Sequence, residues 1–279
     1  MLTLNIHGRL VHYDHPVVMG IINATPDSFH AGSRCATPAE AAAAASRMVG
    51  EGAGMLDVGA CSTRPGAEPV DAATEWERLR PVLEAVREAV GPDFPVSVDT
   101  FRAGIARKAC EGGLADIIND VGGGMLDPDM HQLVAELRVP YILTHMRGTP
   151  ATMQQLCDYP DGVTAGVIAE LQAALTSLTQ AGVADVIVDP GFGFAKTIEQ
   201  NYRLLHDLPV VAQALQRPLL AGLSRKSMAT RLCGISADEA LPATSVLNAL
   251  ALQGGSAILR VHDVAAARHV VAMIHMFNS

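Results

Sequence analysis

Residues 95–121, PVSVDTFRAGIARKACEGGLADIINDV, contain one complete strand–helix–strand unit and decide the fold. Residues 95–100 and 116–121 are short apolar runs, as in strands buried on both faces, and both contain polar side chains at or near their ends. Residues 102–110 between them are predicted to form a helix. Because parallel strands need a crossover connection, usually a helix, this unit predicts a parallel α/β fold.

The same unit recurs along the chain in both directions. The predicted strands are residues 17–23, 55–59, 95–100, 116–121, 140–146, 185–191, 218–224 and 257–263. The predicted helices are residues 37–50, 71–90, 102–110, 127–137, 162–181, 198–215, 243–252 and 264–277. Eight such units in 279 residues favour a closed TIM (β/α)8 barrel. The alternative, an open doubly wound sheet, is less favoured because no GxGxxG follows the first strand.

Residues 1–16 lie outside the repeat. The sequence TLNI-HG-RLVHY predicts a β-hairpin that turns at His7 and Gly8. We expect this hairpin to plug the N-terminal end of the barrel. No low-complexity linker divides the rest of the sequence, so we expect residues 1–279 to form a single domain.

Composition narrows the class of protein. The chain has 20 Lys and Arg against 29 Asp and Glu, a formal net charge of −9, which argues against binding nucleic acid or an anionic membrane. Hydrophobic residues make up 49% and charged residues 18%, which excludes a disordered chain. The five cysteines are scattered, with no CxxC pair, so we expect no disulfide framework and no structural zinc. Without an apolar signal-peptide core or a membrane-spanning run, the chain is expected to be cytoplasmic.

Every predicted strand carries polar or ionisable residues at or near its C-terminal end, and a barrel gathers those ends around one mouth. Asp99, Asn119 and Asp189 suit a flat heterocycle with adjacent N–H donors, because a carboxylate accepts two parallel hydrogen bonds. Lys226, in the sequence SRKS, could neutralise one carboxylate or donate to the ring. Alternatively, these carboxylates are structural and pair with arginine. The full set of polar residues at the strand ends is Asn23, Asp57, Asp99, Asn119, Asp120, His145, Asp189, Ser224, Arg260 and His262.

A second set of residues at the same mouth is basic. Arg260 and His262 alternate along RVHD, so both should point to one face of the strand, and Arg64 follows the second strand. Arg and His together favour a phosphate or pyrophosphate ligand. Alternatively, Arg260 only pairs with a carboxylate. Asn23 could help to hold Mg²⁺, which prefers oxygen ligands and substrate phosphates.

Three loops could close over a substrate. Residues 23–33 and 59–69 are long and rich in turn-forming residues, as in loops that exclude water from a site. The third loop, in DPGFGFAK, brings Phe194 and Lys196, which could line a small aromatic or anionic substrate. Met146, at a strand end, could contact a planar ligand.

Four residues have plainer interpretations. Asp57 and Asp120 could be loop anchors rather than ligand groups. His145 is interpreted as a hydrogen-bonded strand-end histidine, because no His or Cys lies at metal-ligand spacing from it. Cys61 has no identifiable base beside it in the sequence, which argues against a nucleophile.

Eight motifs together resemble the dihydropteroate synthase family in order and spacing, from about residue 17 to the C-terminus. They are MGIINATPDSF, LDVGACSTRPGA, VSVDT, IINDV, HMRGTP, DPGFGFAK, GLSRKS and LRVHDV. The resemblance implies a TIM barrel, usually a homodimer, that acts in folate biosynthesis and requires Mg²⁺. It also implies the reaction: 4-aminobenzoate joins (7,8-dihydropterin-6-yl)methyl diphosphate, giving 7,8-dihydropteroate and pyrophosphate. Sulfonamides compete with 4-aminobenzoate in this family.

Site roles follow from the resemblance, motif by motif. The residues that resemble the pterin pocket are Asp99, Asn119, Asp189 and Lys226. Asn23 resembles the Mg²⁺ contact, and Thr63, Arg64, Arg260 and His262 resemble the pyrophosphate side. The residues that resemble the surroundings of 4-aminobenzoate are Phe29, Pro65, Phe194 and Ser224. Asp99, Asp189, Lys226 and Arg260 are the expected catalytic residues, in a dissociative, SN1-like substitution.

One departure from the family pattern keeps other functions open. The family commonly has GGESTRPG where this chain has GACSTRPG, so Cys61 replaces a glutamate, and residues 30–33 differ as well. A catalytically altered pterin-binding paralogue is therefore one alternative. A methyltetrahydrofolate-dependent methyltransferase domain, which shares the pterin barrel, is another. A third is a Schiff-base aldolase that uses Lys226.

Overall fold

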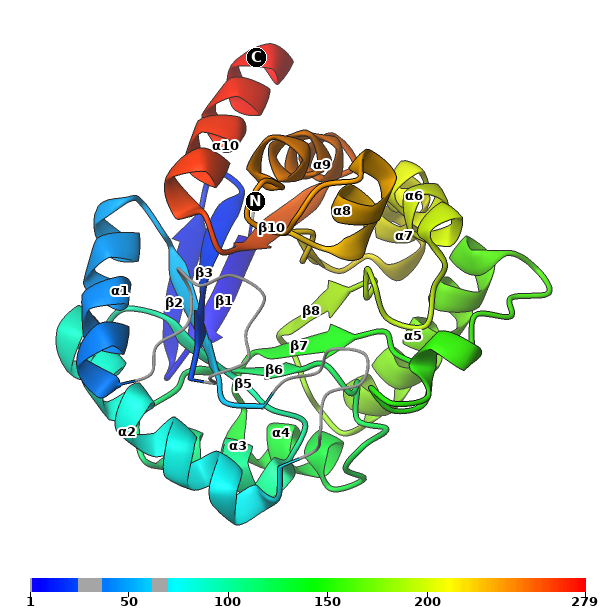
Figure 1. The fold of residues 1–279 in the computed structure, drawn as a ribbon. Helices are drawn as coiled ribbons and strands as arrows, with labels where there is room; N and C mark the ends of the chain where they lie inside the picture. The colour runs from blue at the N-terminus through cyan, green and yellow to red at the C-terminus, as the bar shows by residue number, and fades with distance from the viewer. Residues whose placement is uncertain (1, 25–36, 62–69) are drawn as a thin grey trace.

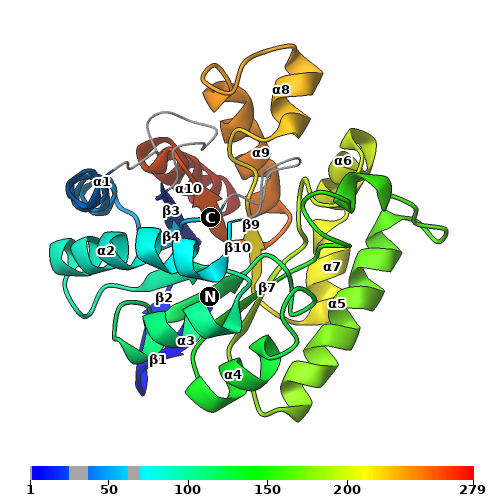
Figure 2. The same cartoon turned by 60° about the horizontal axis from the view of Figure 1, so that its bottom comes forward.

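The computed structural model describes residues 2–24, 37–61 and 70–279. Within these residues, eight parallel strands pair in sequence order and close into a barrel, because the last strand pairs with the first (Figures 1 and 2). The strands are β3 (Val17–Asn23), β4 (Met55–Gly59), β5 (Val96–Asp99), β6 (Ile117–Asp120), β7 (Tyr141–Thr144), β8 (Val186–Asp189), β9 (Leu219–Ala221) and β10 (Ser256–Val261). The predicted TIM barrel is confirmed.

The barrel strands are buried on both faces, as their apolar runs predict. In β6, Ile117 belongs to the cluster inside the barrel, whereas the next residue, Ile118, packs in the layer between strands and helices. In β8, Ile187 and Val188 divide in the same way. Successive side chains of a strand point to opposite faces, so a continuous apolar run fills both layers.

The N-terminal hairpin closes one end of the barrel. Strand β1 (Leu2–Ile6) pairs antiparallel with β2 (Arg9–Tyr13), and the turn uses positive φ at both His7 and Gly8, +51° and +81°. This is the backbone that a two-residue hairpin turn requires. Three side chains of β1 join the cluster inside the barrel: Leu2, Leu4 and Ile6. The predicted hairpin plug is therefore present.

Helices surround the barrel (Figure 1). They are α1 (Pro38–Gly50), α2 (Ala72–Val90), α3 (Ala103–Glu111), α4 (Met130–Leu137), α5 (Val163–Gln180), α6 (Ile198–His206), α7 (Leu208–Leu215), α8 (Ser227–Cys233), α9 (Leu241–Gln253) and α10 (Val264–Asn278), with a short 3-10 helix at Met153–Gln155. In the part of the chain that the structure describes, no helix combines the length and the apolar character needed to cross a membrane.

Two features of the helices differ from the sequence prediction. Residues 198–215 form two helices rather than one, with Asp207 between them. The reason is Pro209, which has no N–H to donate to the carbonyl of Leu205 and so cannot continue α6. The second helix starts afresh, with the N–H groups of Val210 and Val211 bonded to the carbonyl of Asp207. Helix α8 was not predicted, because its seven residues are too few to show a clear apolar period.

Candidate active site

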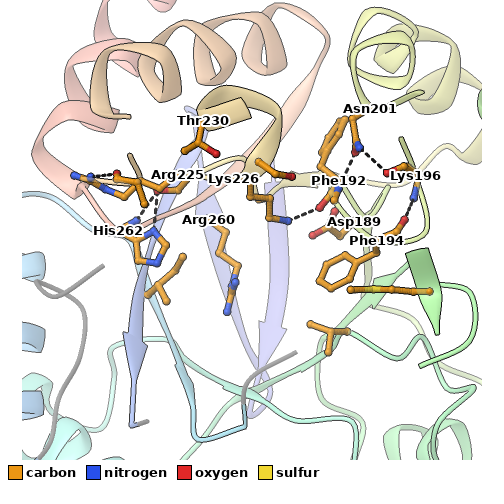
Figure 3. A pocket seen from close by; sticks show the side chains of 18 of the residues that line it. Asp189, Phe192, Phe194, Lys196, Asn201, Arg225, Lys226, Thr230, Arg260 and His262 are labelled. Atoms are coloured by element: carbon orange, nitrogen blue, oxygen red, sulfur yellow. Dashed lines mark hydrogen bonds between the residues drawn. The ribbon is translucent and has the colours of Figure 1, made fainter. Parts of the chain in front are cut away.

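A cavity of about 760 Å³ opens at the C-terminal ends of the barrel strands (Figure 3). Asp189 and Arg260 both line it, so the acidic and basic residues predicted from the sequence do meet at one site. Parallel strands place their C-terminal ends at one rim, and this explains why residues far apart in the chain come together. The predicted site residues that line the cavity are Asn23, Asp99, Asn119, Asp189, Phe194, Lys196, Ser224, Lys226, Arg260 and His262.

Arg260 lies at the centre of a hydrogen-bonded network of carboxylates. Its Nε donates to Asp57 Oδ2 at 2.5 Å, and its Nη2 donates to Asp99 Oδ2 at 2.6 Å. Asn119 Nδ2 donates to the same Asp57 oxygen at 2.9 Å. Arg260 therefore pairs with carboxylates, as one interpretation of the sequence held, and it also faces the cavity. Asp57, fully buried in β4, orients both Arg260 and Asn119.

The charges in this network influence one another. Burial lowers the pKa of Arg260, but the Asp57 and Asp99 carboxylates raise it more, so the guanidinium remains a cation. Burial raises the pKa of Asp99 to about 7, and Arg260 opposes that rise. Burial likewise raises the pKa of Asp189, while Lys226 lowers it. Both acids are thus poised to respond to a cationic or hydrogen-bond-donating ligand.

The side chains of Asp189 and Lys226 face the same space beside Gly222. A Cβ atom added to Gly222 would lie 3.7 Å from both Asp189 Oδ2 and Lys226 Nζ, so the absence of a side chain leaves space in front of both groups. Lys226 Nζ donates to the Phe192 carbonyl at 2.5 Å and lies 4.9 Å from the centroid of the Phe194 ring. Burial lowers the pKa of Lys226 to about 8, and the Asp189 carboxylate opposes this.

Two successive residues of the loop after β9 have different roles. Ser224 lines the cavity, and Arg225 anchors the loop. Ser224 Oγ lies 2.9 Å from His262 Nδ1 and accepts the backbone N–H of His262 at 3.2 Å. The next residue, Arg225, has a positive φ of +55° and pairs with both oxygens of Asp263 at 2.8 and 2.9 Å. Buried Arg225 therefore ties this loop to the start of α10. No role was predicted for Arg225 from the sequence.

Some predicted site residues are not brought to the cavity or are not described. Met146 is a correction: it does not line the cavity but is buried in a small cluster with Met153 and Ala195, beneath Phe194. Phe29, Thr63, Arg64 and Pro65 lie outside the described residues, as do residues 30–33.

The plainer interpretations of three residues hold. Asp120 accepts the N–H groups of Gly122 and Gly124, both at 2.7 Å, and is a loop anchor. His145 is buried and hydrogen-bonded on both ring nitrogens. Cys61 lines the cavity, but burial raises the pKa of its thiol, so the weakly nucleophilic protonated form predominates at neutral pH.

Asn201 is another cavity residue whose role was not predicted from the sequence. Asn201, on the buried face of α6, accepts the N–H of Gly193 at 2.7 Å and donates to the Thr197 carbonyl at 2.7 Å. It therefore joins α6 to the loop that bears Phe194. The signal in the sequence was its helical spacing with Leu204 and Leu205, which marks a polar residue on an apolar face.

The donor set fits Mg²⁺ only together with a substrate. Among the described residues, no group of three or more His, Cys, Asp or Glu side chains could hold a metal ion. Asn23, at the end of β3, does offer an oxygen to the cavity. Mg²⁺ is commonly held by one or two protein oxygens with substrate phosphates and water completing its shell, so the residues present fit this kind of site.

The fold and the site are those of a pterin-binding enzyme: residues 19–262 match the family described as "Pterin binding enzyme". The dihydropteroate synthase of Synechocystis sp. is 42% identical over 253 residues, which cover 89% of this chain and 86% of that protein. The chain belongs to the dihydropteroate synthase family.

Solved structures agree with this assignment. The dihydropteroate synthase of Yersinia pestis, described in complex with a sulfonamide drug, superposes with a TM-score of 0.92 at 33% identity over 99% of both chains. The dihydropteroate synthase of Xanthomonas albilineans, solved with 4-aminobenzoic acid, has a TM-score of 0.88 at 37% identity. That alignment covers 99% of this chain and 98% of the other.

Proposed function

We propose that this protein condenses 4-aminobenzoate with (7,8-dihydropterin-6-yl)methyl diphosphate to give 7,8-dihydropteroate and pyrophosphate, a step of folate biosynthesis. One observation carries the proposal: a single cavity is lined by Asp189 and Lys226 and also by Arg260. Such a cavity can bind a ring with hydrogen-bond donors and, beside it, an anionic leaving group.

The pterin ring is assigned to the acidic part of the cavity. Asp189 Oδ2 faces the space over Gly222 and can accept hydrogen bonds from the ring N–H groups. Lys226 Nζ, directed at the same space, donates to a ring acceptor. Asn119 and Asp99 line the same cavity and supply an amide and a carboxylate. The Asp99 and Asp189 carboxylates also stabilise the positive charge that develops on the pterin methylene carbon.

The diphosphate is assigned to Arg260 and His262. Asp57 and Asp99 hold the Arg260 guanidinium by two of its nitrogen atoms, which fixes its orientation before substrate binds. Thr63 and Arg64 belong to the same proposal from the sequence. Mg²⁺, held by Asn23 and the diphosphate oxygens, would supply further positive charge to the leaving group.

The reaction needs no strong base. The aryl amine of 4-aminobenzoate is a weak base, so it is neutral and nucleophilic at pH 7. In the proposed SN1-like substitution, the methylene C–O bond breaks and its electron pair leaves with pyrophosphate. The amine lone pair then forms the new C–N bond, and the nitrogen loses one proton. The protein contributes positioning and electrostatic stabilisation rather than covalent chemistry.

The side of the cavity near Phe194 is assigned to 4-aminobenzoate. Phe194 and Ser224 line it, and Phe29 and Pro65 are assigned there from the sequence. The Phe194 ring lies beside the Lys226 ammonium, so an aromatic carboxylate would meet both an apolar face and a cation. We expect sulfonamides to compete for this position.

The assembly, the location and the domain organisation are proposed as well. A homodimer is supported by exposed apolar side chains on two neighbouring helices, α9 and α10, which include Val246, Leu250, Met273, Met276 and Phe277. We name these five residues the α9–α10 patch. Residues 1–279 are proposed as one domain, because the hairpin at the start packs inside the barrel that β10 completes. Location in the cytoplasm remains a prediction from composition.

The test is a pyrophosphate-release assay with the pterin diphosphate, with and without 4-aminobenzoate and Mg²⁺. We expect release that needs both the amine and the metal, together with formation of 7,8-dihydropteroate. Release that depends on neither would overturn the proposal. Borohydride trapping of Lys226 with a carbonyl substrate would instead indicate a Schiff-base aldolase, and transfer of a methyl group from methyltetrahydrofolate would indicate the methyltransferase.

A further inference from the structure

A buried lysine holds the loop between β8 and α6, residues 190–197. Lys196 is 3% exposed, and its ammonium group lies 2.9 Å from the Gly191 carbonyl and 3.0 Å from the Phe194 carbonyl. It also lies 2.9 Å from His145 Nδ1 (Figure 3 shows Lys196 and Phe194). An ammonium group has three N–H donors, so these three acceptors use all of them.

The loop needs such ties because its backbone is unusual. Gly191, Gly193 and Ala195 have positive φ angles of +72°, +85° and +48°. For alanine this left-handed region is unfavourable, since the Cβ atom approaches the following carbonyl oxygen. The loop also passes close to β7: a Cβ atom added to Gly191 would lie 1.9 Å from the His145 carbonyl oxygen. Local preference therefore opposes this conformation at Ala195, and the Lys196 hydrogen bonds are among the buried ties that hold the loop.

A chain of polar contacts links Lys196 to the surface. His145 Nδ1 accepts a hydrogen bond from the Lys196 ammonium, so the ring hydrogen is on Nε2, which donates to Glu170 Oε2 at 3.0 Å. Burial lowers the pKa of His145 to about 4, which keeps the ring neutral and able to accept. Glu170 also pairs with Arg147 on the surface of the protein.

The series of contacts returns to the loop through Arg147 and Tyr159. Arg147 lies over the Tyr159 ring, 3.8 Å from its centroid, and the Tyr159 hydroxyl donates to the Ala195 carbonyl at 3.0 Å. The same loop is therefore held both by Lys196 and by Tyr159.

We propose that Lys196 is a positioning residue whose ammonium group, held by His145, fixes the Gly191 and Phe194 carbonyls and thereby sets where Phe194 lies in the cavity. This inference rests on the proposed function, in which Phe194 contacts 4-aminobenzoate. Removal of the Lys196 proton leaves two donors for three acceptors, which loosens the loop.

The surroundings of Lys196 give this role a pH dependence. Burial lowers the pKa of Lys196 to about 7, the Asp189 and Glu170 carboxylates raise it, and the Lys226 and Arg147 cations lower it. Neutral His145 contacts Lys196 directly, the thiol of Cys157 is near enough to be influenced by its charge, and the Tyr159 hydroxyl donates to the Ala195 carbonyl next to it in the chain. Because the pKa is lowered, the ammonium form predominates below about pH 7 and is lost above it. The KM for 4-aminobenzoate should therefore rise with pH through this range.

The first experiment compares Lys196→Met with Lys108→Met, a matched change at an exposed lysine on α3. Loss of charged hydrogen bonds in Lys196→Met should raise the KM for 4-aminobenzoate about tenfold at pH 6.5. The KM for the pterin diphosphate should stay close to the wild-type value, and the rise in KM around pH 7 should disappear. Lys108→Met should behave as wild type. An equal rise of both KM values in Lys196→Met would overturn the positioning role.

The second experiment uses a milder change at the far end of the chain of contacts. Glu170→Gln removes a charge that raises the pKa of Lys196, so the midpoint of the KM–pH curve should move to lower pH. Glu136→Gln is the control, since Glu136 is also a half-exposed partner of an arginine, Arg107. A midpoint that does not move in Glu170→Gln would contradict the inference.

Hydrogen exchange separates this inference from the proposed function, because it needs no substrate. In the free protein, the amides of Gly193 and Phe194 should exchange about tenfold faster in Lys196→Met than in wild type. If the wild-type protein makes no dihydropteroate but exchange is faster in the variant, the proposed function fails and the positioning role stands. If the wild type is active and the variant changes neither exchange nor KM, the positioning role is wrong.

Discussion

Asp57 does not line the cavity, but it orients the side chains of two residues that do. One of its oxygens, Oδ2, accepts from both Arg260 and Asn119, so a single carboxylate orients a cation and an amide. Among the described residues, its other oxygen, Oδ1, is buried and has no hydrogen-bond partner. Such an atom costs about 1–3 kcal/mol, a cost consistent with a group kept for orientation rather than stability. From the sequence, Asp57 was counted among the polar residues at the strand ends and interpreted as a possible loop anchor.

At the residue scale, the sharpest prediction concerns Asp189. Asp189→Asn should lower kcat/KM by about 100-fold, because an amide cannot stabilise developing positive charge as a carboxylate does. The fold should persist, since the Asn side-chain oxygen can still accept the Gly191 N–H. Steady-state kinetics and thermal denaturation measure the two effects.

The matched control for this change is Asp185→Asn, at the opposite end of the same strand region. Asp185 accepts the backbone N–H of Asn5 and lies far from the mouth in the register of β8. Its replacement should leave kcat/KM unchanged. Full activity of Asp189→Asn would refute the assignment of Asp189 to the site.

At the scale of elements, the hairpin and the β8–α6 loop have opposite roles at the two ends of the barrel. The hairpin fills the N-terminal end with apolar side chains and contributes stability. The loop at the C-terminal end combines three positive-φ residues with buried polar ties and contributes the site. This division between a stabilising end and a chemical end is typical of TIM barrels.

The hairpin provides the prediction at this scale. Leu4 in β1 is 2% exposed, whereas Leu10 in β2 is 60% exposed. Leu4→Ala should lower the free energy of unfolding by about 2–5 kcal/mol, through lost burial and the cavity left behind. Leu10→Ala should change it by less than about 0.5 kcal/mol.

Urea denaturation measures both free energies of unfolding. Since the hairpin lies at the end of the barrel away from the cavity, KM values for both substrates should be unchanged in the folded Leu4→Ala protein. A loss of stability in Leu10→Ala as large as in Leu4→Ala would contradict the assignment of the plug to β1.

At the scale of the whole molecule, closure of the barrel places the cavity and the α9–α10 patch on different parts of the protein. The cavity lies at the strand ends, whereas the end of α10 projects from the barrel in Figure 1. Phe277, near this end, is 76% exposed. An exposed group of large apolar side chains is typical of a protein–protein interface.

The prediction at this scale is that Phe277→Asp converts the proposed homodimer into a monomer, because a charge would be buried in the interface. Val210→Asp on α7 is the control, since Val210 is also exposed, at 52%, but lies outside the patch. Analytical ultracentrifugation should show the mass of two chains for wild type and for Val210→Asp. A wild-type protein with the mass of a single chain would refute the dimer.

The sequence by itself determined the repeat, the barrel, the hairpin turn and the kinds of side chain at the mouth. Strand and helix periods are local properties, so they can be counted along the chain, and the positive-φ turn at His7 and Gly8 is local as well. The prediction of a single helix over residues 198–215 was wrong, because the effect of Pro209 was not taken into account.

Only the tertiary structure decided which of these side chains meet. Arg260 pairs with Asp57 across 203 positions of the chain, and Met146 is buried against Met153 and Ala195 although it follows a strand end. Lys196 lines the cavity, as interpreted from the sequence, but only the structure shows that its ammonium group is tied to His145 and two carbonyl groups. A local period tells which face of an element is buried but not which groups from other elements it faces. Those partners depend on closure of the barrel and on the register of its strands.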